Sequence, residues 1–187
     1  KVLHVVSMAI DRGGHTRSLY SWIVVDSQTC HSIVLTGQKG APVPDWLIDS
    51  VSRSGGMFHS IPSSATFTQR VLDLRHVAKS GYDLIVLHHH PNDVVPLAAF
   101  AVHDLPPVAM RNHSDIMFSL GTSVADVVVE YRDCGVLLSK VRRKVCRSFM
   151  LPTPMHHIAK SGLRDAERRK LGFPDNAIVL LTVGSAY

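Results

Sequence analysis

The stretch VLHVVSMAIDRGGHTRSLYSWIVVD, residues 2–26, decides the fold class of this 187-residue chain. Its first five residues, Val2 to Val6, are an apolar run typical of a buried strand. The paired glycines Gly13 and Gly14 follow, and the patterned segment from Thr16 to Val25 has the length of a helix. A strand that passes through glycines into a helix is typical of the opening unit of a parallel α/β sheet.

The same alternation continues along the chain. Further strand-like runs are HSIVLT (31–36), MFHSIP (57–62), YDLIVLHHH (82–90), PPVAMRN (106–112), DVVVEY (126–131) and SFMLP (148–152). Further helix-like segments span 46–53, 67–79, 94–102 and 133–143. Near-continuous apolar strands indicate a sheet covered on both faces. The sequence therefore predicts an α/β fold, a Rossmann-like parallel sheet sandwiched by helices.

A composition change divides the chain near residue 158. After LPTPM (151–155) comes the polar, basic segment 156–176, and then a new apolar run, AIVLLTVG (177–184). The last run is either the first strand of a second domain or a final strand of the same sheet. We assign residues 1–158 to the Rossmann-like domain, and residues 159–187 to a linker and the first strand of a second domain.

The charge of the chain narrows the classes of partner, and its cysteine content indicates the cellular compartment. The formal net charge is +5, and basic residues gather at Lys140, Arg142, Arg143 and Lys144. Such a cluster is a solvated helix face, a contact with an anionic membrane, or a site for an anionic ligand. Few aromatic residues accompany it, which disfavours nucleic acid. Three widely spaced cysteines fit a reducing compartment, so we expect a cytoplasmic protein.

Three polar segments follow strands whose carboxyl ends should meet at one edge of the sheet: DRGGHTRS, HHHPND and RNHSD. Gly13 and Gly14 let a backbone approach a phosphate at the helix start, or only form a tight turn. The glycines lack the G-x-G-x-x-G spacing, and no acid ends the second strand, which disfavours NAD. No G-K-[ST] follows, which disfavours a P-loop.

The histidines of the other two segments have several interpretations. His88, His89 and His90 would point to alternate faces of a strand, so all three cannot bind one metal ion. With Asp93 and His113 they could still form the metal site of a hydrolase. His113 and Asp115 suit a general base oriented by an acid, or a histidine that hydrogen-bonds a hydroxylated or phosphorylated ligand. A structural loop is the alternative.

Taken in order, these segments resemble a known family. GGHTRS, YDLIVLHHH, PPVAMRNHSD, VADVVVEYRDCGVLLSK, FMLPTPM and RRKLGFPDNAIVLLTVGSAY are similar to the N-terminal domain of retaining GT-B glycosyltransferases, which include bacterial mannosyl- and glucosyltransferases of polysaccharide and glycolipid synthesis. Two positions depart from the pattern: Arg132 stands near the family's usual serine, and LPTPM replaces its P-N-G.

The resemblance implies a function. Such an enzyme moves a sugar from a nucleotide-sugar donor to a glycan, lipid-linked or protein acceptor, and uses no metal or other cofactor. Most donor contacts belong to its second domain, so we expect this chain alone to bind donor weakly and to be inactive. The basic cluster would contact the inner face of the membrane peripherally. The alternatives are a non-catalytic Rossmann-like binding domain and a metal-dependent hydrolase.

The resemblance also implies site residues. His113 and Asp115 take the catalytic positions. The substrate-binding positions are Gly13, Gly14, His15, Arg17, His89, His90, Arg111 and Asn112, of which His89 and His90 are assigned from their place at the sheet edge.

Overall fold

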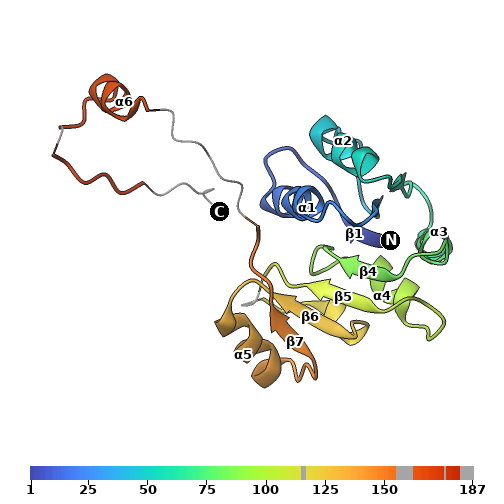
Figure 1. Ribbon diagram of the computed structural model, residues 1–187. Coiled ribbons are helices and arrows are strands. Elements are labelled where there is room, and N and C mark those ends of the chain that lie inside the picture. The colour runs from blue at the N-terminus through green and yellow to red at the C-terminus, as the bar shows by residue number, and fades with distance from the viewer. Residues whose placement is uncertain (115–116, 155–161, 175, 182–187) are drawn as a thin grey trace. The chain divides into compact units, whose positions relative to one another are not determined.

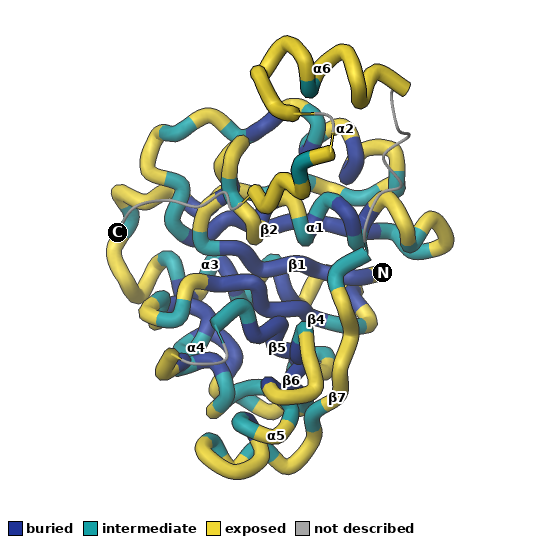
Figure 2. Tube along the Cα trace, turned by 90° about the vertical axis from the view of Figure 1, so that its left-hand side faces the viewer, coloured by how far each residue is buried: buried dark blue, intermediate teal, exposed yellow. Residues whose placement is uncertain are grey.

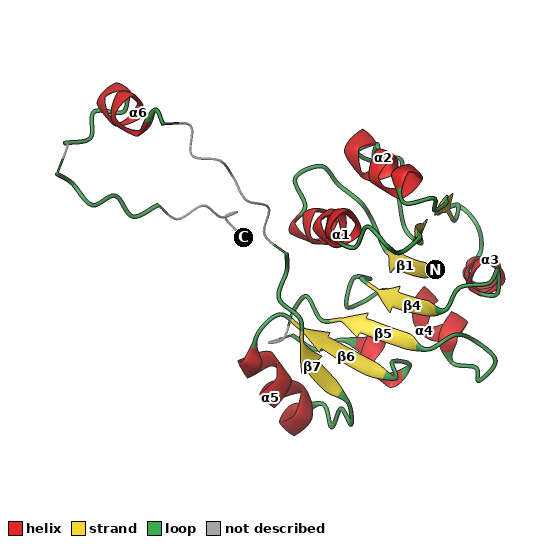
Figure 3. Ribbon diagram, viewed as in Figure 1, coloured by secondary structure: helices red, strands yellow, loops and turns green. Residues whose placement is uncertain are grey.

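The computed structural model describes residues 1–114, 117–154, 162–174 and 176–181. It divides the chain into two units, Lys1–Met155 and His156–Tyr187, close to the expected boundary after residue 158. The first unit is an α/β domain with a central sheet and helices on both sides (Figures 1 and 3). That a second domain begins at residue 159 stays a prediction.

The sheet has seven strands, all parallel, in the order β3-β2-β1-β4-β5-β6-β7. The strands are β1 (Val2–Val6), β2 (His31–Leu35), β3 (Phe58–Ser60), β4 (Leu84–Leu87), β5 (Val108–Arg111), β6 (Val127–Glu130) and β7 (Ser148–Met150). Each lies within a predicted run, and the predicted Rossmann-like fold is confirmed. The order reverses between β1 and β4, which is where ligands bind in such sheets.

Helices cover both faces of the sheet. They are α1 (Gly14–Val25), α2 (Asp45–Arg53), α3 (Phe67–Ala78), α4 (Val95–Phe100) and α5 (Asp133–Arg142). Each matches a predicted segment, although α1 begins two residues and α2 one residue earlier than predicted. Leu19 of α1 and Leu47 of α2 pack on Ile33 at one face. Leu74 of α3 and Ala99 of α4 belong to the core of the other face, where α5 also packs against β6 and β7. A short 3₁₀ helix, Leu120–Ser123, was not predicted.

The five inner strands β2, β1, β4, β5 and β6 are buried along most of their length, as their apolar runs indicate, whereas the edge strands β3 and β7 are partly exposed (Figure 2). One face of the sheet, however, carries a row of buried polar side chains beneath α1. His4, His31, His88 and Arg111 are each 3% exposed or less. Residues alternate between faces along a strand, so these four share the α1 face with apolar neighbours such as Val86. The row leads to the carboxyl edge of the sheet.

The second unit contains α6 (Arg164–Lys170), where only a linker was expected. Acidic residues lie in its first turn and basic residues in its last, an arrangement that suits the helix dipole. The strand expected at 177–184 does not form in the part that is described, and its place as the first strand of a second domain stays a prediction. Residues 177–181 are not in a strand, and Ile178 and Leu180 are 90% and 92% exposed. A strand needs a partner for its backbone groups, and none of the described residues supplies one.

The helices of the described ranges are short, and the longest have 12 residues. None of those helices combines the length and the apolar composition needed to cross a bilayer.

Candidate functional site

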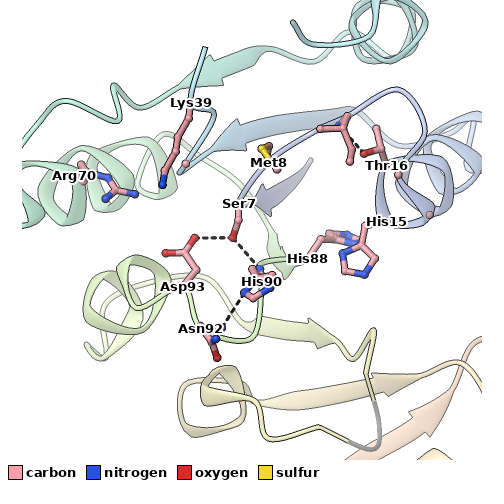
Figure 4. Close-up of a pocket in the computed structure, with 14 residues that line it drawn as sticks. Ser7, Met8, His15, Thr16, Lys39, Arg70, His88, His90, Asn92 and Asp93 are labelled. Carbon is pink, nitrogen blue, oxygen red and sulfur yellow. Dashed lines mark hydrogen bonds between the residues drawn. The ribbon is translucent and has the colours of Figure 1, made fainter. Parts of the chain in front are cut away.

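A cavity of about 620 Å³ opens at the carboxyl edge of the sheet, beside β1, β2 and β4. Figure 4 shows Lys39 and Arg70 at one side of it and His15 and His88 at the other, with Ser7 and Asp93 between them. Gly13, Gly14 and His90 also line it. The structure thus brings four of the predicted substrate-binding residues together, and the size suits a ligand such as a sugar phosphate.

The two glycines at the start of α1 differ in how much space their surroundings leave for a side chain. A Cβ on Gly13 would lie 2.7 Å from Ile10 Cγ1, so the turn is packed too closely for a side chain. A Cβ on Gly14 would meet nothing within 4 Å. No side chain caps the helix, and its first turn contains no acid. Internal packing therefore explains Gly13, whereas Gly14 leaves the positive end of α1 open to an anion.

Lys39 and Arg70 give the cavity a cationic side that the sequence analysis missed. Arg70 Nη2 donates to the Thr36 carbonyl at 2.5 Å, and its buried Nε has no partner among the described residues. Lys39 is exposed and follows β2. The sequence could have predicted Lys39, because residues that follow a parallel strand lie at the carboxyl edge of the sheet, as in the other three polar segments. Arg70 lies inside α3, and no local signal marks it.

Asp93 holds the floor of the cavity together. Its Oδ2 accepts hydrogen bonds from Ser7 Oγ at 2.6 Å and from Thr36 Oγ1 at 2.5 Å, while its Oδ1 accepts from the Val95 amide. Ser7 Oγ also accepts from the His90 amide at 2.8 Å. The carboxylate therefore joins the ends of β1 and β2 to the segment after β4, and it fixes the Ser7 hydroxyl at the cavity.

His113 lies next to the cavity, because its ring stacks on His15, which lines the cavity. The ring centroids are 3.8 Å apart and nearly parallel. His113 Nδ1 shares a hydrogen bond of 2.8 Å with the Tyr131 hydroxyl. Burial, with the charges of His15 and Arg111, lowers the pKa of His113 to about 2. The ring is neutral near pH 7 and suits hydrogen bonding better than proton abstraction. Asp115 lies outside the described residues, so its role beside His113 stays a prediction.

Four of the predicted substrate-binding residues are not among those that line the cavity, and two of these four are His89 and Arg17. His89 is buried on the face of the sheet opposite His88, where a Cβ on Gly121 would come within 2.3 Å of its ring. Arg17 turns outward, 4.4 Å above the Trp46 ring and 3.6 Å from Asp11. His89 faces away from His88 because consecutive residues along an extended chain point to opposite faces of the sheet. Arg17 is held on the outside by its cation–π contact and its ion pair.

Arg111 and Asn112 are engaged inside the domain. Arg111 stacks on Tyr131, with its Cζ atom 3.9 Å from the ring centroid, and borders a separate cavity of about 160 Å³. Asn112 Nδ2 donates to both carboxylate oxygens of buried Glu130 at 3.0 Å, and Ser139 Oγ also donates to Glu130. Asn112 therefore stabilises the end of β6, and the structure does not place it at the larger cavity.

The geometry gives no support to the hydrolase alternative. Within the described ranges, no three His, Cys, Asp or Glu side chains gather as metal ligands. His88 and His89 lie on opposite faces, and the Asp93 carboxylate already accepts three hydrogen bonds.

The basic cluster lies at the end of α5 and includes exposed apolar side chains. Lys140, Arg142 and Lys144 are exposed, and Leu137 and Val141 are 62% and 57% exposed. Arg143 differs, because it donates to Ser139 Oγ and to the Met117 carbonyl.

Comparison of the sequence with models of protein families gives no match, and comparison with curated proteins gives none either.

Proposed function

We propose that this domain is the acceptor-side half of a GT-B glycosyltransferase, which moves a sugar from a nucleotide-sugar donor to a glycan, glycolipid or other acceptor. The cavity at the carboxyl edge is the observation that supports this most directly. It combines an uncapped helix N-terminus at Gly14, two cations, and neutral polar side chains. A sugar phosphate needs that combination, because it has an anionic group and several hydroxyl groups.

Each part of the cavity has a role in this proposal. The free amides at Gly14, with Lys39 and Arg70, face the phosphate groups, where charge-assisted hydrogen bonds are strongest. Ser7, His15 and His90 bind hydroxyl groups. When the bond between sugar and phosphate breaks, negative charge grows on the leaving diphosphate, and the fixed cations stabilise it. A second domain would supply the remaining donor contacts.

We also propose that α5 contacts an anionic membrane surface. Leu137 and Val141 lie four residues apart on α5, so they share one side of the helix, and Lys140, Arg142 and Lys144 flank them. An exposed apolar pair with cations around it is the pattern of a peripheral membrane contact. This contact would place the enzyme at the inner face of the membrane, near lipid-linked acceptors.

Ligand-induced stabilisation tests the proposed site. UDP-glucose and GDP-mannose at millimolar concentration should raise the melting temperature of the chain, since both would bind the folded state alone. Lys39→Gln should weaken the apparent affinity about tenfold, which corresponds to one lost charge-assisted hydrogen bond. Lys140→Gln, which removes the same charge from α5, is the matched control and should change nothing. Equal affinities in all three proteins would contradict the proposed site. Binding without sugar transfer, in a chain that includes the second domain, would favour the non-catalytic alternative.

A further inference from the structure

A chain of hydrogen-bonded histidines crosses the sheet beneath α1 and ends at the cavity. His31 Nε2 lies 3.1 Å from the Asp26 carbonyl oxygen, and His31 Nδ1 lies 3.0 Å from His4 Nε2. His4 Nδ1 lies 3.1 Å from His88 Nε2, and His88 lines the cavity. These three rings are each 2% exposed or less. Such a continuous series of imidazoles connects the two ends of a buried path.

The Asp26 carbonyl sets the tautomer of all three rings. A carbonyl oxygen only accepts, so the proton of neutral His31 is on Nε2 and its Nδ1 is bare. That bare nitrogen accepts from His4 Nε2, which leaves His4 Nδ1 bare to accept from His88 Nε2. His88 Nδ1 is then bare as well. It is buried and has no hydrogen-bond partner among the described residues.

At the His31 end of the histidine series, a carboxylate lies close enough to interact with a positive charge. Asp26 Oδ2 lies 3.4 Å from His31 Nε2, and the Asp26 side chain is 37% exposed. Asp26 thus connects the buried rings to solvent. His88 has the opposite surroundings, because the groups that face it are His4, His15, His113 and Arg111. Burial lowers the pKa of His31 as well, but the Asp26 carbonyl and carboxylate oppose that shift, so a positive charge costs less at His31 than at His88.

We propose that Asp26, His31, His4 and His88 form a charge relay, in which His88 accepts a proton from a hydroxyl group bound in the cavity and the positive charge is stored on His31. His88 is the proton acceptor, and the other three are positioning residues. The proposal rests on the proposed function only in requiring a hydroxyl-bearing ligand. Because Nδ1 is covered, contact with that ligand requires a side-chain rearrangement at the cavity floor.

The proton transfers balance. The ligand O–H bond breaks and its proton binds His88 Nδ1, while the electron pair remains on the ligand oxygen. The Nε2 proton of His88 passes to His4 Nδ1, and that of His4 passes to His31 Nδ1. His31 keeps its Nε2 proton and becomes an imidazolium beside Asp26. Nothing is oxidised or reduced, and both His4 and His88 change from the Nε2–H to the Nδ1–H tautomer.

This coupling has a spectroscopic signature that independent histidines would lack. In the full chain with ¹⁵N-labelled histidine at about pH 7.5, all three rings should be Nε2–H tautomers, with scalar couplings across both N–H···N bonds. As the pH is lowered, His31 should gain its second proton while His4 and His88 change tautomer at the same midpoint. Folded and unfolded molecules exchange slowly, so the folded signals can be followed throughout.

The relay is overturned if any ring is an Nδ1–H tautomer near neutral pH, or if no coupling is seen. It is equally overturned if His88 keeps its tautomer while His31 titrates, or if His31 does not titrate. These results do not depend on ligand binding, so a failure of the proposed function would be seen separately in the melting experiment.

The variant Asp26→Asn tests whether the Asp26 carboxylate stabilises the positive charge on His31. The variant keeps the backbone carbonyl that sets the tautomers, and Asn Oδ1 can still accept the hydrogen bond that Thr29 Oγ1 donates at 2.9 Å. The neutral tautomers should therefore be unchanged, and the midpoint of the switch should move to lower pH. Asp45→Asn, a change at an exposed aspartate of α2, is the matched control and should leave the midpoint unchanged. An unchanged midpoint in Asp26→Asn would overturn the role given to its carboxylate.

Discussion

Lowering the pH from about 7.5 to about 5 should destabilise the domain steeply, because buried histidines remain neutral in the folded state while they become charged in the unfolded state. Burial and the neighbouring His31 lower the pKa of His4 to about 3. Burial, His15 and Arg111 lower the pKa of His113 to about 2. Burial and surrounding charges also hold the pKa of His88 well below its usual value of 6.5.

The sign and size of the effect follow from proton binding. Between about pH 6.5 and about pH 3 the unfolded chain binds more protons than the folded domain, so the free energy of unfolding falls as the pH falls. Each histidine contributes about 1.4 kcal/mol per pH unit in that range, or about 2 kcal/mol by pH 5. Three independent histidines would contribute about 6 kcal/mol, which is comparable to the whole stability of many domains.

Urea unfolding at several pH values measures this directly. His113→Phe keeps a ring at the site and removes one titrating group, so it should reduce the slope of stability against pH by about 1.4 kcal/mol per unit. His76→Gln, at an exposed position of α3, is the control and should leave the slope unchanged. A free energy of unfolding that is constant or rises as the pH falls from about 7 to about 5 would show that these histidines do not stay neutral in the folded domain.

Three further predictions concern packing, the site and the membrane surface. Gly14→Ala should leave the free energy of unfolding unchanged or raise it by up to about 1 kcal/mol, because a Cβ there meets no atom. The same variant should bind UDP-glucose more weakly in the melting assay, and equal binding would count against a ligand at Gly14. Gly121→Ala should lose about 1–3 kcal/mol in urea, since its Cβ would overlap the buried ring of His89; an unchanged midpoint would contradict this packing. Leu137→Gln should reduce co-sedimentation with anionic vesicles without changing the urea midpoint, and undiminished sedimentation would argue against contact through α5.

The fold could be predicted from sequence because the signals for it are local. Apolar runs of strand length, separated by helix-length segments, are enough to indicate a parallel sheet covered on both sides. The same logic found Gly13, Gly14, His15 and His90, because the carboxyl ends of parallel strands meet at one edge. The apolar residues 177–181, which are not in a strand, show the limit of this reasoning, since a strand also depends on a partner.

The details of the site depend on tertiary contacts that no local pattern contains. Arg70 reaches the cavity from α3, and Asn112 is directed to Glu130, a residue on the neighbouring strand. His4 and His31 lie inside strands, where periodicity gives their faces but not the hydrogen bonds between their rings. The relay could therefore be seen only when β1, β2 and β4 were placed side by side.

Mapping of backbone amide shifts during titration with UDP-glucose and GDP-mannose would show whether the cavity at the carboxyl edge binds a sugar phosphate. Weak binding in the millimolar range is sufficient for this measurement. We predict that the largest shifts fall on Gly13, Gly14, His15, Lys39 and His90. Shifts confined to other parts of the domain, or none at about 10 mM ligand, would show that this cavity does not bind the sugar phosphate.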